Sequence, residues 1–144
     1  MKIALDAGPL YQKPNYVSVY TAYLLLNMLE KDPTLQAYAI AFADDKGKQK
    51  LITHKNLIYH YLPMKRSAYE TKAKILGKLA DVSDKAPAHI DAVIYTDYIA
   101  WPYIKSASRK LLFFHGAAHK DAPESLDSKR RKLLDKLIPK SVET

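Results

Sequence analysis

The sequence predicts an α/β fold: an open, mostly parallel, Rossmann-like sheet with helices on both faces. The first observation is a unit at residues 2–31 in which a short apolar run, a loop rich in turn formers and a long apolar segment follow one another. That order describes the first half of a β-α-β unit. The second is that strand-like and helical segments keep alternating afterwards, which implies parallel strands joined by right-handed crossovers. The third is size, since 144 residues of which 48% are hydrophobic suffice for one domain with a real core.

The first unit also gives the first place to look for a site. A strand at residues 3–5 ends at Asp6, and a helix is expected over residues 17–29, with Asn15 as its N-cap and Ser18 as the alternative. This helix is apolar almost all round, so we expect it to be packed between layers. Ligands of such sheets bind beyond the carboxyl ends of the strands, where the loop meets the helix. Asp6 therefore either serves a ligand there or stiffens the loop by accepting hydrogen bonds from backbone N–H groups.

Four further strands are expected, at residues 35–43, 56–62, 90–95 and 109–114. The first of these has small residues on one face, which suits close packing of a helix against the sheet. Those small residues are Ala37, Ala39, Ala41 and Ala43, and the opposite face carries Tyr38, Ile40 and Phe42.

Two more helices and one helical turn complete the expected order. Ser67 and Glu70 form a capping box, which predicts a helix running to about residue 81. Its core face is expected to consist of Ile75, Leu76 and Leu79. A short helical turn is expected around residues 103–107. The last helix is expected over residues 126–138, closed by Pro139, and its core face is Leu133, Leu134, Leu137 and Ile138. The pattern calls for another strand after it, so we expect an unfinished version of the fold.

Composition and charge restrict the function classes. The chain has no Cys, which excludes disulfides and thiolate zinc sites, and it has neither a signal-peptide-like start nor an apolar run of membrane-spanning length. We therefore expect a soluble cytoplasmic protein. The net charge is +8. It is interpreted first as a solvated Lys-rich surface, second as peripheral attraction to an anionic inner membrane face, and least as nucleic-acid binding, because no basic stretch is interleaved with aromatic residues.

Several common motifs are missing from the sequence. There is no G-x-x-x-x-G-K-[ST], no G-x-G-x-x-G after a strand and no G-x-S-x-G, which argues against phosphate-loop hydrolases, ordinary dinucleotide dehydrogenases and α/β-hydrolases. His115 and His119 are four residues apart, but Gly116 and the lack of an intervening Glu make them a weak metal pair. We expect no metal site.

The order and spacing of four segments nevertheless resemble one enzyme family. Residues 1–10, Met-Lys-Ile-Ala-Leu-Asp-Ala-Gly-Pro-Leu, are similar to the start of many family-four retaining glycosyltransferases of the two-domain GT-B architecture. Residues 15–25 occupy the position of that family's Gly-rich loop and following helix. Residues 90–95 with Tyr98 and Pro102 are similar to its fourth strand and loop, and residues 111–116 to its fifth strand with a terminal His-Gly. Residues 137–144 look like the lead into its sixth strand. The resemblance covers nearly the whole chain as a pattern.

The resemblance implies a function and a set of site residues. Residues 1–144 would be the N-terminal, acceptor-binding domain, and the C-terminal domain that holds the nucleotide-sugar through an E-x7-E motif is not contained in them. The reaction would be sugar transfer from a nucleotide-sugar to a glycan or lipid-linked acceptor with retention at the anomeric carbon, with no metal and no cofactor. His115 matches the catalytic histidine that contacts the donor sugar. Asn15 and Tyr16 fall at the diphosphate loop, and Asp97 and Tyr98 on the acceptor side.

The sequence also departs from that family's pattern. Gly8, which we place among the substrate-binding residues, stands where Arg is common, and Tyr16 and Ser18 stand where Gly is common. A bulky Tyr16 does not allow the close backbone approach that Gly allows, so diphosphate contact here requires the loop to move. Two other classes stay open. One is a non-catalytic nucleotide- or sugar-binding module, and the other is an unrelated open-sheet protein of the flavodoxin type.

Overall fold

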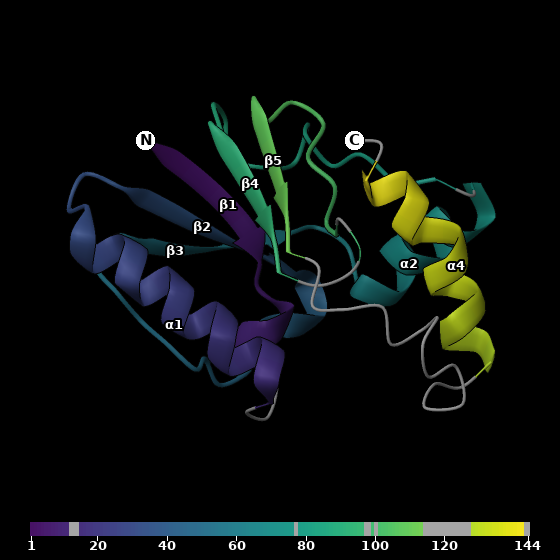
Figure 1. Ribbon diagram of the computed structural model, residues 1–144, viewed down its shortest axis with the longest axis horizontal. Coiled ribbons are helices and arrows are strands. Elements are labelled where there is room, and N and C mark those ends of the chain that lie inside the picture. The colour runs from purple at the N-terminus through teal and green to yellow at the C-terminus, as the bar shows by residue number, and fades with distance from the viewer. Residues whose placement is uncertain (12–14, 77, 97–98, 100, 114–127, 143–144) are drawn as a thin grey trace.

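The predicted fold class is confirmed. A computed structural model describes residues 1–144 except 12–14, 77, 97–98, 100, 114–127 and 143–144. Its described residues form a five-stranded, all-parallel sheet in the order β3-β2-β1-β4-β5 (Figure 1). The strands are β1 (Lys2–Asp6), β2 (Gln36–Phe42), β3 (Leu57–Leu62), β4 (Ala92–Tyr95) and β5 (Arg109–Leu112).

Strand β1 lies at the centre of the sheet because the chain builds outward from it in both directions. Ile3 is in register with Ala37 of β2 on one side and with Ala92 of β4 on the other. After β3 the chain returns to the far side of β1 before it forms β4 and β5. The sheet therefore has a topological switch point between β1 and β4, and ligands of open α/β sheets bind outside the carboxyl ends of the strands at such points.

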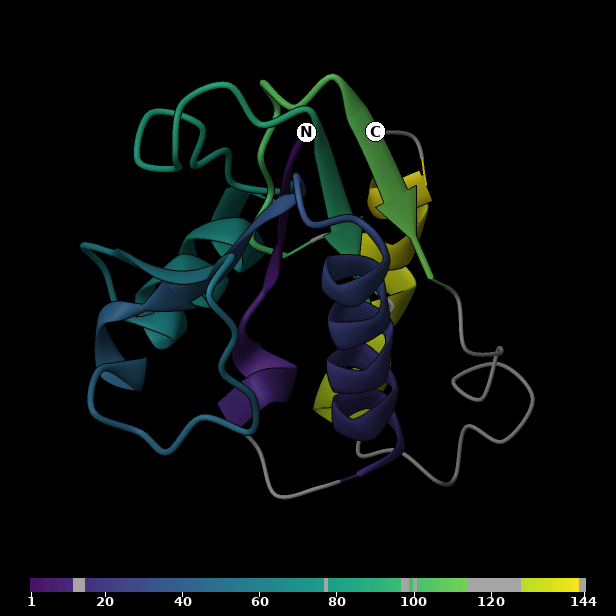
Figure 2. The ribbon, with the colours of Figure 1, turned by 90° about the vertical axis from the view of Figure 1, so that its left-hand side faces the viewer.

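Helices cover both faces of the sheet, as predicted. Helix α1 (Tyr16–Lys31) lies on one face, and α2 (Arg66–Leu76) and α4 (Ser128–Val142) lie on the other (Figures 1 and 2). The alternation along β2 matches this arrangement. Its alanines pack in the α1-side core with Leu25 and Leu29, whereas Ile40 and Phe42 pack in the opposite core with Tyr69. The small alanine side chains leave room for Leu25 and Leu29 of α1 to pack on this face of the sheet.

The crossover from β2 to β3 contains only a short 3₁₀ turn, η2 (Ala43–Asp45). The later part of this crossover packs on the α1 side. There the Leu51 N–H donates to the Leu10 carbonyl at 2.9 Å, and Ile52 contacts the α1-side core. Leu10 belongs to a second 3₁₀ turn, η1 (Gly8–Tyr11), which directly follows β1. The crossover and the turn after β1 are thus joined to each other by a backbone hydrogen bond.

The expectation that α1 is packed between layers is wrong. Only one face of the helix is buried, and it consists of Ser18, Thr21, Leu25 and Leu29. On its outer side Tyr16, Val19 and Tyr23 are 70%, 56% and 71% exposed. An apolar sequence is buried only where a second element covers it, and among the described residues no second layer lies over this side.

The predicted start and core face of the second helix are also wrong. Helix α2 begins at Arg66 and not after Ser67, because the Asp44 carboxylate accepts a hydrogen bond from the Arg66 N–H at 3.0 Å. It ends at Leu76, and its buried residues are Tyr69 and Ala73. Ile75 and Leu76 therefore face outward, 78% and 49% exposed, while Leu79 is buried as expected but lies beyond the helix.

Two further local expectations are corrected. Pro139 does not close the last helix, which continues to Val142 with Leu137 and Ile138 buried as predicted. Residues 103–107 contain no helical turn. Tyr103 instead forms a parallel bridge with Asp81, and a hydrogen-bonded turn follows it. The pairing of Tyr103 with a distant segment satisfies backbone groups that a local helix would otherwise have satisfied.

Candidate functional site at the carboxyl edge of the sheet

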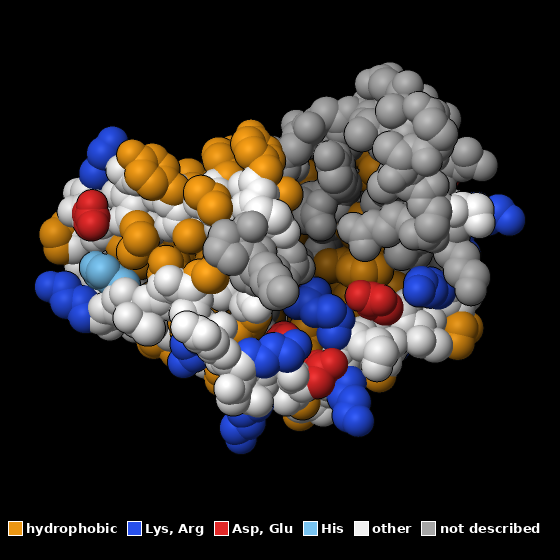
Figure 3. Space-filling view, turned by 90° about the horizontal axis from the view of Figure 1, so that it is seen from below, with side chains coloured by type: hydrophobic (Ala, Val, Ile, Leu, Met, Phe, Trp, Pro, Cys, Tyr) orange, Lys and Arg blue, Asp and Glu red, His pale blue; other side chains and the backbone are white. Residues whose placement is uncertain are grey.

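The carboxyl edge around the switch point is the candidate site. Asp6 ends β1 there, and the buried Thr96 directly follows β4. Strands β1, β4 and β5 run downward in Figure 1, so Figure 3, which is seen from below, looks toward the ends of these three strands. Basic and acidic side chains lie side by side near the middle of this face, and hydrophobic side chains gather on the left of the view (Figure 3).

An ion pair between Asp6 and Arg66 is the main feature of this edge. The Arg66 Nη2 donates to Asp6 Oδ1 at 2.9 Å, and Nη1 lies 3.4 Å from Oδ2. Asp6 Oδ1 also accepts a hydrogen bond from the Gly8 N–H at 2.9 Å. The expected stiffening of the loop by Asp6 is therefore confirmed, and Arg66 joins the loop after β1 to the start of α2.

A second carboxylate, from Asp45, completes the cluster. Its Oδ2 lies 3.9 Å from Arg66 Nη2 and accepts a hydrogen bond from the Phe42 N–H at 3.0 Å, while its Oδ1 binds Lys48 Nζ at 2.8 Å. The Arg66 guanidinium also lies 4.5 Å from the centre of the Phe42 ring, within cation–π range. Two carboxylates and two cations balance one another, so the cluster braces the site and leaves no net charge of its own.

Burial and neighbouring charge act in opposite directions on Arg66. Loss of solvent lowers the pKa of its guanidinium, but the carboxylate of Asp6, with Asp45 and Glu70 behind it, raises the pKa above its ordinary value. Arg66 therefore stays charged at every accessible pH.

The Asp6 and Arg66 side chains lie so close to Gly8 that they leave no room for a side chain there. A Cβ at this position would lie 2.7 Å from Arg66 Nη2 and 2.9 Å from Asp6 Oδ2, closer than real Cβ atoms come to such groups. Gly8 is itself buried. It lies directly against the ion pair, and its assignment to substrate binding stays a prediction.

The other sequence-predicted residues fall into two groups. Asn15 caps α1 through a reciprocal capping box, in which its Oδ1 accepts from the Ser18 N–H at 2.9 Å and Ser18 Oγ accepts from the Asn15 N–H at 2.7 Å. Tyr16 begins the helix and stacks with Tyr20, at 6.3 Å between ring centres. The remaining three predicted site residues, Asp97, Tyr98 and His115, lie outside the described residues.

Three tyrosines support the turn after β1. The Tyr11 and Tyr61 hydroxyls are 3.0 Å apart, and the Tyr11 and Tyr59 rings pack at 5.5 Å. The Tyr59 hydroxyl donates to the Ile52 carbonyl at 2.8 Å. Burial raises the pKa of Tyr59 to about 12, and burial also raises the pKa of Tyr11. These two hydroxyls are therefore neutral near neutral pH and act as hydrogen-bonding supports.

Sequence reasoning missed Arg66 and Asp45. A signal was present, because Asp6 ends one strand and Arg66 follows another, and parallel strands end at the same edge of a sheet. An Arg soon after β3 was therefore a candidate partner for a carboxylate at the end of β1. Lys48 and Lys65 compete for the same position in the sequence, so only the fold selects Arg66.

Neither a metal centre nor a membrane-spanning helix is found in the described part of the chain. No group of three or more His, Cys, Asp or Glu side chains is arranged to hold a metal ion in it. None of its helices combines the length and apolar character needed to cross a bilayer. What the described residues offer at this edge is a braced loop and a helix N-terminus beside the switch point.

Comparisons with known proteins add no assignment. No family model matches the chain, and no curated protein or solved structure matches it either.

Proposed function

We propose that the chain is the N-terminal, acceptor-binding domain of a retaining glycosyltransferase with two domains. The full enzyme moves a sugar from a nucleotide-sugar donor to a glycan or lipid-linked acceptor in the cytoplasm. The strand order carries the proposal, because it puts the carboxyl ends of β1, β4 and β5 next to one another at a switch point. Gly8, Asp97 with Tyr98, and His115 follow these three strands in the sequence.

The position of Arg66 supports this proposal. In the family that the sequence resembles, an arginine commonly occupies the position of Gly8. Here Gly8 has no side chain, and the Arg66 guanidinium fills the space beside it. The same chemical group thus reaches this point of the loop from the start of α2.

The proposed mechanism is electrostatic. Departure of the nucleotide leaves a sugar with oxocarbenium character, and hydrogen-bond donors with fixed dipoles stabilise the separating charges. His115 donates a hydrogen bond to the donor sugar, and Asp97 and Tyr98 hold the acceptor. The N-terminus of the 16-residue helix α1, at Asn15 and Tyr16, supplies a partial positive charge on the diphosphate side of the site.

The first experiment tests whether residues 1–144 form only the acceptor side of the active site. Purified protein of residues 1–144 is expected to show no transfer from nucleotide-sugars, because the donor-binding wall is supplied by a second domain. The reading frame after Thr144 is expected to contain that domain with an E-x7-E motif. Turnover by residues 1–144 alone, or saturable binding of a flavin or dinucleotide to them, would contradict the proposal.

The second experiment concerns His115. In the full-length enzyme, His115→Ala is expected to lower kcat by roughly 100-fold, the range seen when one donor to a transition state is removed. His54→Ala is the matched control, because His54 lies just before β3 at the amino edge of the sheet. Equal rates for the two variants would remove His115 from the site.

A further inference from the structure

A pocket of about 540 Å³ lies on the α2–α4 side of the sheet, away from the carboxyl edge. Four lysines line it, Lys72, Lys78, Lys105 and Lys140, together with one carboxylate, Asp81. They come from α2, from the segment after it, from the turn before β5 and from α4. Four lysines from four segments of the chain thus line one cavity, and together with Asp81 they give its lining a formal net charge of +3.

The carboxylate in the pocket is already engaged. Asp81 Oδ1 accepts hydrogen bonds from the Ser83 N–H at 3.0 Å, the Ser83 hydroxyl and the Lys105 N–H at 3.1 Å. Within the described part of the chain, Lys72, Lys78 and Lys105 have no carboxylate within 4.0 Å of their Nζ atoms. Their positive charge is therefore left for a ligand or for solvent.

Hydrogen bonds join two of the segments that form the pocket wall. The Tyr69 hydroxyl donates to the Ala80 carbonyl at 2.9 Å and accepts from the Tyr103 N–H at 3.0 Å. The Val82 N–H in turn donates to the Tyr103 carbonyl at 3.0 Å. Tyr69 is 1% exposed and ties the segment after α2 to the segment before β5. Lys105 belongs to this hydrogen-bonded wall, because its own N–H donates to Asp81 Oδ1, and this part of the backbone is therefore positioned before any ligand binds, which reduces the entropy cost of binding.

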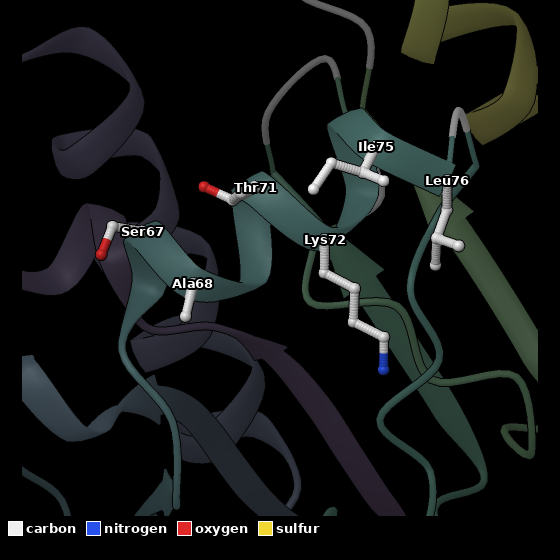
Figure 4. A pocket seen from close by; sticks show the side chains of 6 residues that line it. All are labelled: Ser67, Ala68, Thr71, Lys72, Ile75 and Leu76. Carbon is white, nitrogen blue, oxygen red and sulfur yellow. The ribbon is translucent and has the colours of Figure 1, made fainter.

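An apolar strip adjoins the lysines. Lys72 and Leu76 line both this pocket and a shallow hollow of about 510 Å³ along the outer side of α2. Figure 4 shows the side chains of that hollow, all from α2, with Ile75 and Leu76 at one end beside Lys72 (Figure 4). Ile75 is 78% exposed. The surface therefore offers a cluster of positive charges followed by a small apolar area.

We propose that the four-lysine pocket binds a phosphate group. A phosphate presents several oxygens and up to two negative charges on one small centre, so it can contact several ammonium groups at once, and lysine binds it as a point charge. The group comes either from a soluble phosphate compound or from a lipid headgroup whose chain lies against Ile75. The proposal is independent of the proposed glycosyl transfer, which belongs to the carboxyl edge of the sheet.

Two binding measurements test the proposal and separate the two sources. Pyrophosphate titrated into the protein, followed by calorimetry, tests the soluble source. Co-sedimentation with phosphatidylcholine vesicles, with and without phosphatidylglycerol, tests the lipid source. The variant is Lys78→Glu with Lys105→Glu, and the control is Lys46→Glu with Lys55→Glu, which makes the same charge change at exposed lysines of the β2–β3 crossover.

The expected result is binding in at least one arm, weakened at least tenfold by the pocket variant and less than threefold by the control. Ile75→Ser should weaken only the vesicle arm, and only if the lipid headgroup is the source. A pocket variant that fails to fold is replaced by Lys78→Gln with Lys105→Gln, checked by circular dichroism. No binding in either arm, or equal losses in pocket variant and control, would overturn the proposal.

Discussion

At the scale of single residues, Gly8 lies in close contact with the Asp6–Arg66 pair. The loop-stiffening role of Asp6 could be predicted from the sequence, because a carboxylate at the end of a strand commonly bonds the next backbone N–H groups. Its partner could not, since Arg66 is 60 residues away and several lysines were equally plausible. The choice depends on which side chain the folded backbone brings within 3 Å.

This contact makes Gly8→Ala a specific test of the cluster. The new Cβ must displace the guanidinium, so we expect a loss of about 1–3 kcal/mol in the free energy of unfolding, the usual cost of overpacking. In the Arg66→Ala background, Gly8→Ala should lower the free energy of unfolding by less than half as much. A double-mutant cycle with urea denaturation measures this difference.

Gly47→Ala is the control for this cycle. Gly47 has a φ of 87°, and a Cβ added to it would have nothing within 4 Å, so its cost of about 1 kcal/mol comes from backbone strain alone. That cost should be the same with and without Arg66. Coupling of similar size at both glycines would show that the Gly8 effect does not arise from the ion pair.

At the scale of elements, the sequence predicted which helices and strands exist better than it predicted how they begin and which way they face. The five strands were recognised because each contains a cluster of apolar residues near turn residues, although β5 begins with Arg109 and Lys110. The start of α2 was not, because a capping box is a local pattern, whereas the group that bonds the Arg66 N–H is Asp44, which precedes β3. The outward-facing side of α1 was missed for a related reason, since exposure depends on neighbours and not on the helix itself.

Substitutions can show whether Asp44 or Ser67 caps the start of α2. Asp44→Ala removes the bond to Arg66 N–H and should cost about 0.5–1 kcal/mol, whereas Ser67→Ala should stay within about 0.5 kcal/mol, as at an ordinary surface position. Chemical denaturation of both variants measures the difference. The reverse order would restore the capping box as the true helix start.

The same carboxylate gives a pH dependence with a defined sign. The hydrogen bond from the Arg66 N–H lowers the pKa of Asp44 below its usual value. A carboxyl group whose pKa is lower in the folded state stabilises the protein above the unfolded-state pKa of about 3.9. That contribution is lost as the pH falls through the lower, folded-state value. Between pH of about 5 and 3, wild-type protein should therefore lose more stability than Asp44→Asn, which keeps a capping amide without a titrating charge.

At the scale of the whole molecule, the two cores lie on opposite faces of one sheet and share its strands. Leu25 belongs to the α1-side core and Leu137 to the α4-side core, and both are at most 2% exposed. Strand β2 contributes to both cores through alternate residues. Parallel pairing and the division of the helices between two faces were predictable from the alternation of elements, but the strand order itself appears only in the structure.

We expect both cores to unfold in one transition. Leu25→Ala and Leu137→Ala should each cost about 2–5 kcal/mol. Trp101, the single tryptophan, packs edge-on to Tyr69 on the α4 side and reports that core by fluorescence, while far-UV circular dichroism reports the whole fold. Leu25→Ala should shift both signals to the same denaturant midpoint. Separate midpoints would show that the two faces unfold independently.

The strand order also leaves β3 and β5 as the outermost strands of the described sheet, each with one margin that no other described strand pairs. Such margins are where separate molecules can join strand to strand and grow into insoluble fibres. In β5 this hazard is countered by brevity and charge, because the strand has only four residues and begins with Arg109 and Lys110. A second molecule that paired there in parallel would bring two pairs of positive charges together. Repulsion between like charges thus keeps neighbouring molecules apart at the place where hydrogen bonding would otherwise link them.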